Sequence, residues 1–297
     1  FNEGGTNPVK VCQDALVEAN RQGRDTIILD TAGRLHIDDD LMAELSLIEK
    51  KLFIRQADVF AAYLAYTDHE IGRVVQGFED LGRLDNTLII YISGDNGASG
   101  EGMINGTPNE FTTFNGIEVP VKDQFLWYEF WGSDKTFPHY SAAWAWAMVT
   151  PFKWVKQVPS HFGGTAQGLA ISWPGHITDV GAIRRQFHHV IDIVPTIYEL
   201  TKITPPKVVN GFEQDPIAGT SMVYALGDAK APGTRKTQFF DIMASRGIYH
   251  DGWFASAPGP REPWVGGIPK GVREWSPLTD KWELYNIDED WSQANDL

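Results

Sequence analysis

The chain has 297 residues, with 25 Lys and Arg against 39 Asp and Glu, so its formal net charge is −14. This balance argues against non-specific nucleic-acid binding, which depends on Lys and Arg neutralising phosphates, and no apolar run approaches the roughly 18 residues that a bilayer span needs. The single cysteine, Cys12, excludes an internal disulfide. We therefore expect no nucleic-acid partner, no membrane and no disulfides. Because no signal-peptide pattern is present, the default expectation for the location is cytoplasmic.

The first fifty residues carry a pattern typical of nucleotide-binding proteins. A short strand over 25–30 ends at Asp30, and Thr-Ala-Gly-Arg follows. In P-loop NTPases such a carboxylate acts on Mg²⁺ and the Gly backbone N–H approaches the terminal phosphate. Asp30, Gly33 and Arg34 are therefore candidate nucleotide-binding residues.

The fuller string over 29–38 resembles the signal recognition particle GTPases, and the likeness covers about residues 7–50. The phosphate-cradling G-x-x-x-x-G-K-[ST] loop is absent from the sequence, and so is the Thr-Lys-x-Asp pattern that specifies guanine. A non-enzymatic, GTPase-derived interaction module is therefore one alternative for this protein.

Apolar residues then follow helical spacing from about residue 55 to residue 81, and Gly82 ends the run. A periodic pattern of this length predicts a kink or a join of two helices. The apolar run 88–92 is rich in β-branched residues, which favours a strand covered on both faces, as in a parallel sheet. Large and small residues alternate over 143–148, and this alternation predicts another strand.

Asp95 and Asn96 follow the strand over 88–92 and lie between two glycines. In open α/β sheets, ligands bind beyond the carboxyl ends of the strands. A carboxylate and an amide oxygen at such a position suit Ca²⁺ or Mg²⁺. The alternative is a polar turn that only caps the strand.

From about residue 55 to residue 297 the sequence resembles bacterial arylsulfatases of the type I sulfatase family. Many spaced motifs agree in order, so the signal is stronger than any one motif. They lie at 67–73, 85–88, 93–97, 150–154, 160–165, 171–174, 192–196, 219–221 and 282–286.

The resemblance implies metal-assisted hydrolysis of sulfate esters, with a small aryl sulfate ester as the substrate of a completed site. It implies that Asp95 and Asn96 are two of four ligands to a divalent cation, for which the family indicates Ca²⁺, and that Lys153 contacts the sulfate. An ammonium between Phe152 and Trp154 is also suited to an anion on elementary grounds, although a lysine extended over aromatic rings is the alternative. His161 is a candidate substrate-binding residue where many sulfatases have Glu.

The implied fold is α/β: an incomplete alkaline-phosphatase-like sulfatase sheet with helices on both faces, and a small C-terminal antiparallel subdomain. We expect a GTPase-like α–β–α segment over 1–54, a sulfatase-like core over 55–204 and the subdomain over 205–297. The subdomain is expected to hold short strands at 237–243, 246–250, 252–255 and 282–285.

The family's nucleophile is a formylglycine made from the Cys of a C-x-P-x-R motif, and this sequence contains no such motif. Cys12 is followed by Gln-Asp-Ala-Leu. We therefore expect a truncated or chimeric arylsulfatase-family chain that is inactive as it stands and binds Ca²⁺ weakly. A phosphatase or phosphodiesterase of the same superfamily is a further alternative.

Overall fold

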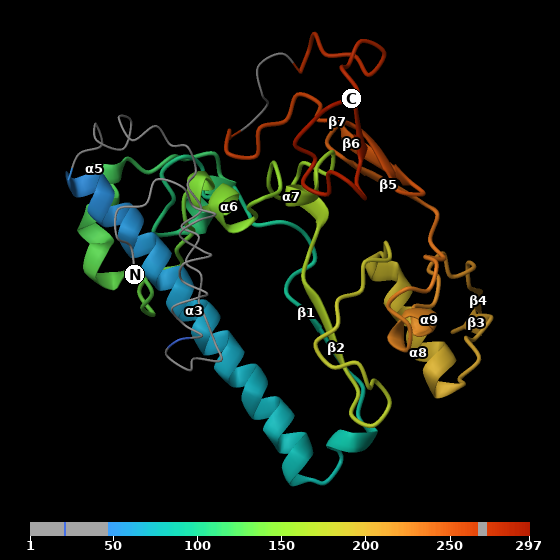
Figure 1. Cartoon of the computed structure of the whole chain (residues 1–297). Coiled ribbons are helices and arrows are strands. Elements are labelled where there is room, and N and C mark those ends of the chain that lie inside the picture. The colour runs from blue at the N-terminus through green and yellow to red at the C-terminus, as the bar shows by residue number, and fades with distance from the viewer. Residues whose placement is uncertain (1–20, 22–46, 267–271) are drawn as a thin grey trace. The chain divides into compact units, whose positions relative to one another are not determined.

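The computed structural model describes residue 21, residues 47–266 and residues 272–297 (Figure 1). The chain divides into two compact units, residues 1–45 and 46–297, and every element named below belongs to the second. The candidate nucleotide-binding residues Asp30, Gly33 and Arg34 lie outside the described residues, and so does Cys12. The division at residues 54 and 204 stays a prediction.

A single long helix, α3 (Leu47–Asp80), opens the described part. The sequence predicts a kink or a join here, and this is wrong: the 34 residues form one continuous helix (Figure 1). Gly82 ends the run as predicted, with a left-handed φ of +62° that glycine adopts without a Cβ penalty. The side chain of Gln56, which is buried, fixes α3 to the following segment. It donates to the Asn105 carbonyl at 2.8 Å and accepts from the Ser141 N–H at 2.9 Å.

The strand β1 (Ile89–Ile92) pairs with β2 (Leu169–Ser172) in an antiparallel two-stranded sheet. The expectation of a parallel strand covered on both faces is therefore wrong. Tyr91 and Ile92 are 40% and 37% exposed. The apolar run correctly predicts a strand. An apolar run alone does not determine the direction of the partner strand or what covers each face.

Residues 143–148 form a helix, α6 (Ala142–Met148), so the predicted strand is wrong there as well. The two buried residues, Ala142 and Ala145, are three apart, which is the helical period. The hydroxyl of Ser141 accepts from the Trp144 N–H at the N-terminus of the helix. The alternation of Trp and Ala has the two-residue period of a strand, but alanine is a strong helix former and Ser141 provides an N-cap, so the segment forms a helix.

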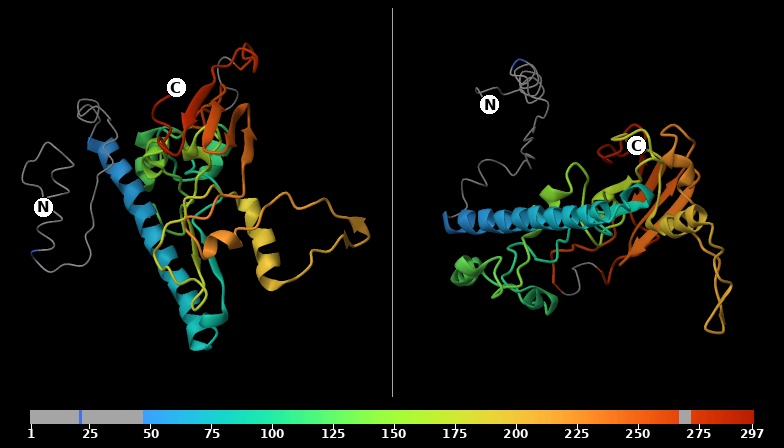
Figure 2. Two further views of the ribbon diagram at one scale, coloured as in Figure 1. Left: turned by 45° about the vertical axis from the view of Figure 1, so that its right-hand side comes forward. Right: turned by 90° about the horizontal axis from the view of Figure 1, so that it is seen from below.

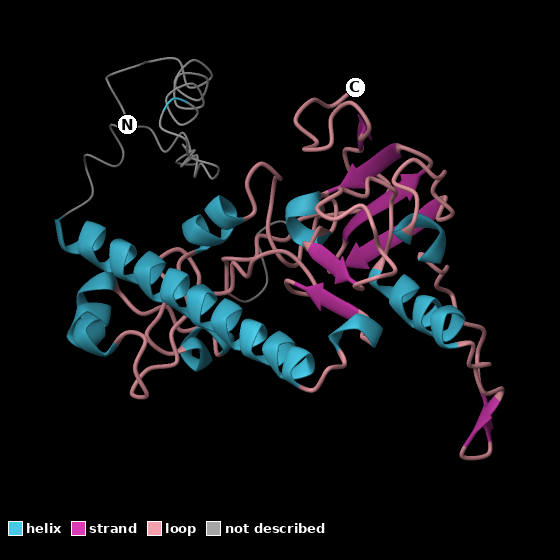
Figure 3. Ribbon diagram, turned by 60° about the horizontal axis from the view of Figure 1, so that its bottom comes forward, coloured by secondary structure: helices cyan, strands magenta, loops and turns pink. Residues whose placement is uncertain are grey.

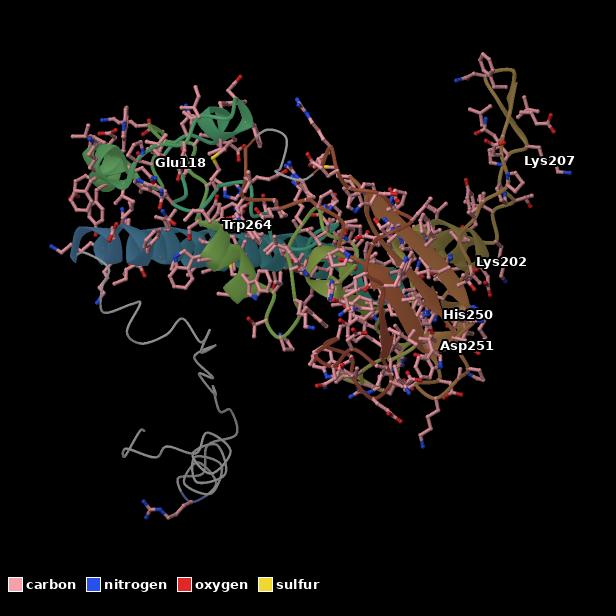
Figure 4. The ribbon with its side chains drawn as sticks, turned by 90° about the horizontal axis from the view of Figure 1, so that it is seen from above. Glu118, Lys202, Lys207, His250, Asp251 and Trp264 are labelled. Atoms are coloured by element: carbon pink, nitrogen blue, oxygen red, sulfur yellow. The ribbon has the colours of Figure 1, made fainter. Side chains whose placement is uncertain are left out.

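The C-terminal antiparallel subdomain is confirmed (Figure 3). It is a four-stranded sheet in the order β5-β6-β7-β8, and Phe254 and Tyr285 on its inner face are fully buried. The turn between β6 and β7 consists of Asp251 and Gly252, both at positive φ, which is the geometry that a two-residue hairpin turn requires. Figure 4 labels Asp251 beside His250, the last residue of β6. The strands are β5 (Thr237–Ile242), β6 (Ser245–His250), β7 (Trp253–Ala257) and β8 (Glu283–Asn286).

Short elements connect these parts (Figure 2). Together they confirm the predicted α/β class, with helices and sheets mixed along the chain. No helix among residues 47–266 and 272–297 combines the length and the hydropathy of a membrane span. The remaining elements are η1 (Leu84–Asn86), α4 (Glu110–Phe114), α5 (Val121–Gln124), η2 (Phe125–Phe130), α7 (Phe162–Thr165), η3 (Val190–Asp192), α8 (Ile193–Thr201), β3 (Val208–Val209), β4 (Phe212–Glu213) and α9 (Val223–Leu226).

Candidate functional site

The turn that carries Asp95 and Asn96 follows β1 directly and is held against α7. The Gly97 N–H donates to the Gly164 carbonyl at 3.0 Å. A Cβ on Gly97 would lie closer than 3.0 Å to the Gly163 carbonyl oxygen, so only glycine allows this approach. The Gln167 side-chain amide also donates to the Asn96 carbonyl. Backbone contacts therefore fix the turn in place.

A cleft of about 620 Å³ opens at this turn. Asp95 and Asn96 line it together with residues of α7, of the segment 183–193, and of β5 and β6. Most of the lining is aromatic or aliphatic, as in pockets that bind small molecules. The aromatic lining residues are Phe152, Phe162, Phe187, Phe240, Tyr249 and Trp291, and the charged or titratable ones are Asp95, Arg184, Arg185, His188, His189 and Asp288.

The residues at the turn fit a cation only in part. The Asn96 amide group donates to the Asp95 Oδ1 atom at 2.8 Å, so the two side chains lie together. They offer at most three side-chain oxygens, two from the carboxylate and one from the amide, while Ca²⁺ takes six to eight oxygen ligands. Within residues 47–266 and 272–297, no group of three or more His, Cys, Asp or Glu side chains could hold a metal ion. Within the described residues, no further cluster of such ligands therefore joins the Asp95 turn.

Lys153 does not line the cleft. Its ammonium lies 5.4 Å from the centroid of the Tyr285 ring and donates to the Ala294 carbonyl at 3.4 Å. The Ala294 N–H lowers the pKa of the Asp290 carboxyl against the effect of burial, the Leu284 N–H lowers that of Asp296, and the Lys153 charge adds a smaller part to both. The structure thus places Lys153 beside the acidic C-terminal segment and does not bring it together with Asp95 and Asn96.

His161 is 1% exposed and sits in a closed hydrogen-bonding network. Its Nδ1 atom lies 2.9 Å from the Ser160 hydroxyl, and its Nε2 atom lies 3.2 Å from Glu283 Oε2. The Tyr285 hydroxyl donates to the same carboxylate oxygen at 2.7 Å. Burial lowers the pKa of His161 to about 4; the Glu283 carboxylate opposes this shift, and the Lys153 ammonium adds to it. The imidazole is therefore neutral at pH 7, and it joins α7 to β8.

His161 should make folding stability depend on pH. Its pKa is about 4 in the folded chain and about 6.5 when unfolded, so the unfolded state takes up the proton first and stability falls as pH drops from about 6.5 towards 4. We expect His161 to account for a loss of about 1.4 kcal/mol between pH 7.5 and 5.5. Urea unfolding at both pH values should show this loss in the wild type and a smaller one in His161→Gln. The exposed His250 gives a control, and an equal slope for His250→Gln and His161→Gln would contradict the prediction.

His188 and His189 are held by hydrogen bonds. The His188 Nε2 atom lies 2.9 Å from the Tyr224 hydroxyl, and the His189 Nδ1 atom accepts from the Ile191 N–H. Burial lowers the pKa of both imidazoles, as does the nearby Arg235 guanidinium. They therefore line the cleft as neutral groups at pH 7.

Arg184 and Arg185 line the cleft, although the sequence did not predict them as site residues. Arg184 donates to the Ala225 and Leu226 carbonyls and pairs with Asp179 at 2.6 Å. Arg185 is exposed on the cleft wall. The signal that could have revealed them is a pair of consecutive arginines in a strongly acidic chain.

An acidic turn at a strand end, aromatic walls and two arginines define an α/β protein with a cleft suited to a small anionic ligand. The sulfatase family model matches residues 6–203. The chain belongs to the sulfatase family, as the resemblance predicts.

Three curated relatives show what parts of the chain are similar to. An uncharacterized sulfatase of Schizosaccharomyces pombe is 34% identical over 165 residues, 55% of this chain and 28% of that protein. An arylsulfatase of Klebsiella aerogenes is 29% identical over 184 residues, 61% of this chain and 37% of that protein. A signal recognition particle protein of Mycoplasma mycoides is 34% identical over 95 residues, 32% of this chain and 21% of that protein, which confirms the predicted second likeness. The chain thus spans about a third of the length of the sulfatases that it matches.

Proposed function

We propose that this chain provides the C-terminal part of a sulfate-ester-binding site, centred on the cleft beyond β1. The match of the sulfatase family model to residues 6–203 carries the proposal. The cleft supports it, because aromatic walls suit an aryl or sugar ring and two arginines suit an anionic substituent. A small aryl sulfate ester is the proposed ligand.

Asp95 and Asn96 are the proposed ligands to a divalent cation, for which the family indicates Ca²⁺. When bound, such a cation would polarise a sulfuryl oxygen. Lys153 is the proposed contact to the sulfate, and His161 the residue that holds α7 and β8 behind it through Ser160 and Glu283. The separation of Lys153 from the Asp95 turn is the observation against which its role has to be tested.

The chain as given is proposed not to hydrolyse sulfate esters, because its sequence contains no C-x-P-x-R motif from which a formylglycine could be made. The purified chain with Ca²⁺ should release no p-nitrophenol from p-nitrophenyl sulfate, while an intact arylsulfatase does so in the same assay. Sulfate turnover that disappears in Asp95→Ala would refute the inactivity. Turnover of p-nitrophenyl phosphate alone would instead favour the phosphatase or phosphodiesterase alternative.

Calcium binding should be weak. At most three side-chain oxygens out of the six to eight that Ca²⁺ takes give little of the affinity of a complete site, and we expect a Kd of about 1 mM or weaker. Calorimetric titration of the chain with CaCl₂ measures it, and Asp95→Asn should abolish the remaining heat, while the same change at the exposed Asp251 should not. A submicromolar Kd would show that other residues complete the site.

The likeness of a third of the chain to a signal recognition particle protein supports a second candidate, a GTPase-derived interaction module. Its nucleotide residues would be Asp30, Gly33 and Arg34. Because the phosphate-cradling loop is absent from the sequence, we expect no binding of a fluorescent GTP analogue at micromolar concentration. Saturable binding that is lost in Asp30→Ala would establish this candidate.

A further inference from the structure

We propose that Arg185 forms an anion subsite in the cleft, which binds a carboxylate or sulfate group carried on a ring-shaped ligand. The inference deepens the proposed function, and rests on it in taking this cleft as the ligand site. It adds that the ligand carries an anionic group that pairs with Arg185. This group is distinct from the sulfate ester that would face the Asp95 turn.

Both neighbours of Arg185 are anchored. Arg184 donates to the Ala225 and Leu226 carbonyls, and Gln186 donates to the Ala231 carbonyl at 2.9 Å. The next ring along, Phe187, stacks on Tyr249 with their centroids 3.8 Å apart and an angle of 6° between the planes. The backbone that carries Arg185 is therefore fixed before any ligand arrives, which reduces the entropy cost of binding.

None of these anchoring contacts involves the guanidinium of Arg185. It makes no hydrogen bond or ion pair with any residue within 47–266 and 272–297, although the chain carries 39 Asp and Glu. In contrast, Arg184 pairs with Asp179, and Arg235 pairs with Asp192. An uncompensated guanidinium on a cleft wall, with its planar fork of donors, is matched to a carboxylate or a sulfate.

The groups around Arg185 leave it as the available cation of the cleft. The histidines at 188 and 189 are held in hydrogen bonds and their pKa values are lowered by burial, so at pH 7 they add no charge. Phe187, Phe240 and Tyr249 present flat apolar surface in the same cleft. A guanidinium in a cleft with aromatic walls fits a ring that carries an oxyanion, because the charge pairs with the oxyanion and the walls contact the apolar ring.

Ligand-observed NMR titration of the full chain with three probes tests this. Benzoate carries a carboxylate, benzenesulfonate a sulfate-like group, and benzamide is a neutral analogue of benzoate. We expect at least one of the two anions to bind about fivefold more tightly than benzamide, the upper end of what an exposed ion pair is worth. Arg185→Ala should remove this preference, and the anion that loses more affinity identifies the group that the subsite prefers.

Arg83→Ala is the matched control. Arg83 is exposed, carries the same charge and does not line the cleft, so its removal should leave the preference for anions intact. If Arg185→Ala fails to fold by circular dichroism, Arg185→Gln keeps the length of the side chain and removes the charge. The proposal is overturned if the wild-type chain shows no preference for either anion, or if the neutral variant keeps the wild-type preference.

Phenyl sulfate, titrated in parallel, separates this result from the proposed function. Failure of phenyl sulfate to bind, with or without Ca²⁺, would count against the sulfate-ester site. The comparison of benzoate, benzenesulfonate and benzamide decides the role of Arg185 independently, because none of these probes is a sulfate ester.

Discussion

Replacing Asp192 by alanine should lower the free energy of unfolding by about 3–5 kcal/mol, because it leaves a buried guanidinium without its partner. Asp192 is fully buried and Arg235 is 8% exposed. The Arg235 Nε atom donates to Asp192 Oδ2 at 2.9 Å, and a second bond runs from its NH2 group to Oδ1. Two backbone N–H groups, those of Thr220 and His189, donate to the same carboxylate.

The measurement is urea unfolding at pH 7, followed by circular dichroism. A matched control is available in the exposed pair of Glu70 and Arg73 on α3. Glu70→Ala should cost less than about 1 kcal/mol, because solvent screens such pairs. Equal losses from Asp192→Ala and Glu70→Ala would show that the buried pair does not stabilise the chain beyond a surface contact.

The physical cause also predicts a consequence for the cleft. The Asp192 carboxylate accepts from the His189 N–H at 2.9 Å in the capping box of η3, and so holds the end of the segment that lines the cleft. The hydrogen bonds it receives, led by those from Arg235, lower the pKa of the Asp192 carboxyl against the effect of burial. The ion pair is therefore intact at neutral pH, and its loss should weaken binding of benzenesulfonate together with stability.

Gly163→Ala should lower the free energy of unfolding by about 3 kcal/mol, because the new methyl group meets backbone that cannot move aside. A Cβ at this position would lie closer than 3.0 Å to the carbonyl oxygens of Lys153 and Trp154. Gly163 also donates its N–H to the Lys153 carbonyl at 3.1 Å. The substitution should therefore push α7 away from the segment that carries Lys153.

The same substitution at Gly72 is the control. Gly72 lies within α3, and a Cβ there has nothing within 4 Å. Gly72→Ala should stabilise the chain by about 1 kcal/mol, since alanine has the higher helix propensity. Urea midpoints of the two variants should shift in opposite directions, and a shift in the same direction would contradict the clash inferred at Gly163.

Two of the three wrong predictions, those over 88–92 and 143–148, have one cause: both concern short segments. Over 88–92 a strand was recognised, but its antiparallel partner lies about eighty residues away, at Leu169–Ser172. Over 143–148 the alternation of Trp and Ala fitted a period of two, while burial of Ala142 and Ala145 follows the helical period. Short runs do not contain enough turns of either period to distinguish them.

The predictions that are confirmed rest on spaced motifs and on turn residues. The sulfatase family, the likeness to a signal recognition particle protein, the helix that ends at Gly82 and the four C-terminal strands all follow from residues close together in the chain. Such features depend on local backbone preferences and on residue identity, which the sequence states directly.

The cleft and its charges were decided only by the tertiary structure. Hydrogen bonds between distant segments leave Arg184 occupied and Arg185 free of any partner in the described residues. Packing encloses His161 and lowers its pKa to about 4, and it sets Lys153 beside Tyr285 and away from the Asp95 turn. The burial of a side chain and its hydrogen-bond or ion-pair partners arise from contacts between distant segments. Neighbouring residues in the sequence therefore do not determine them.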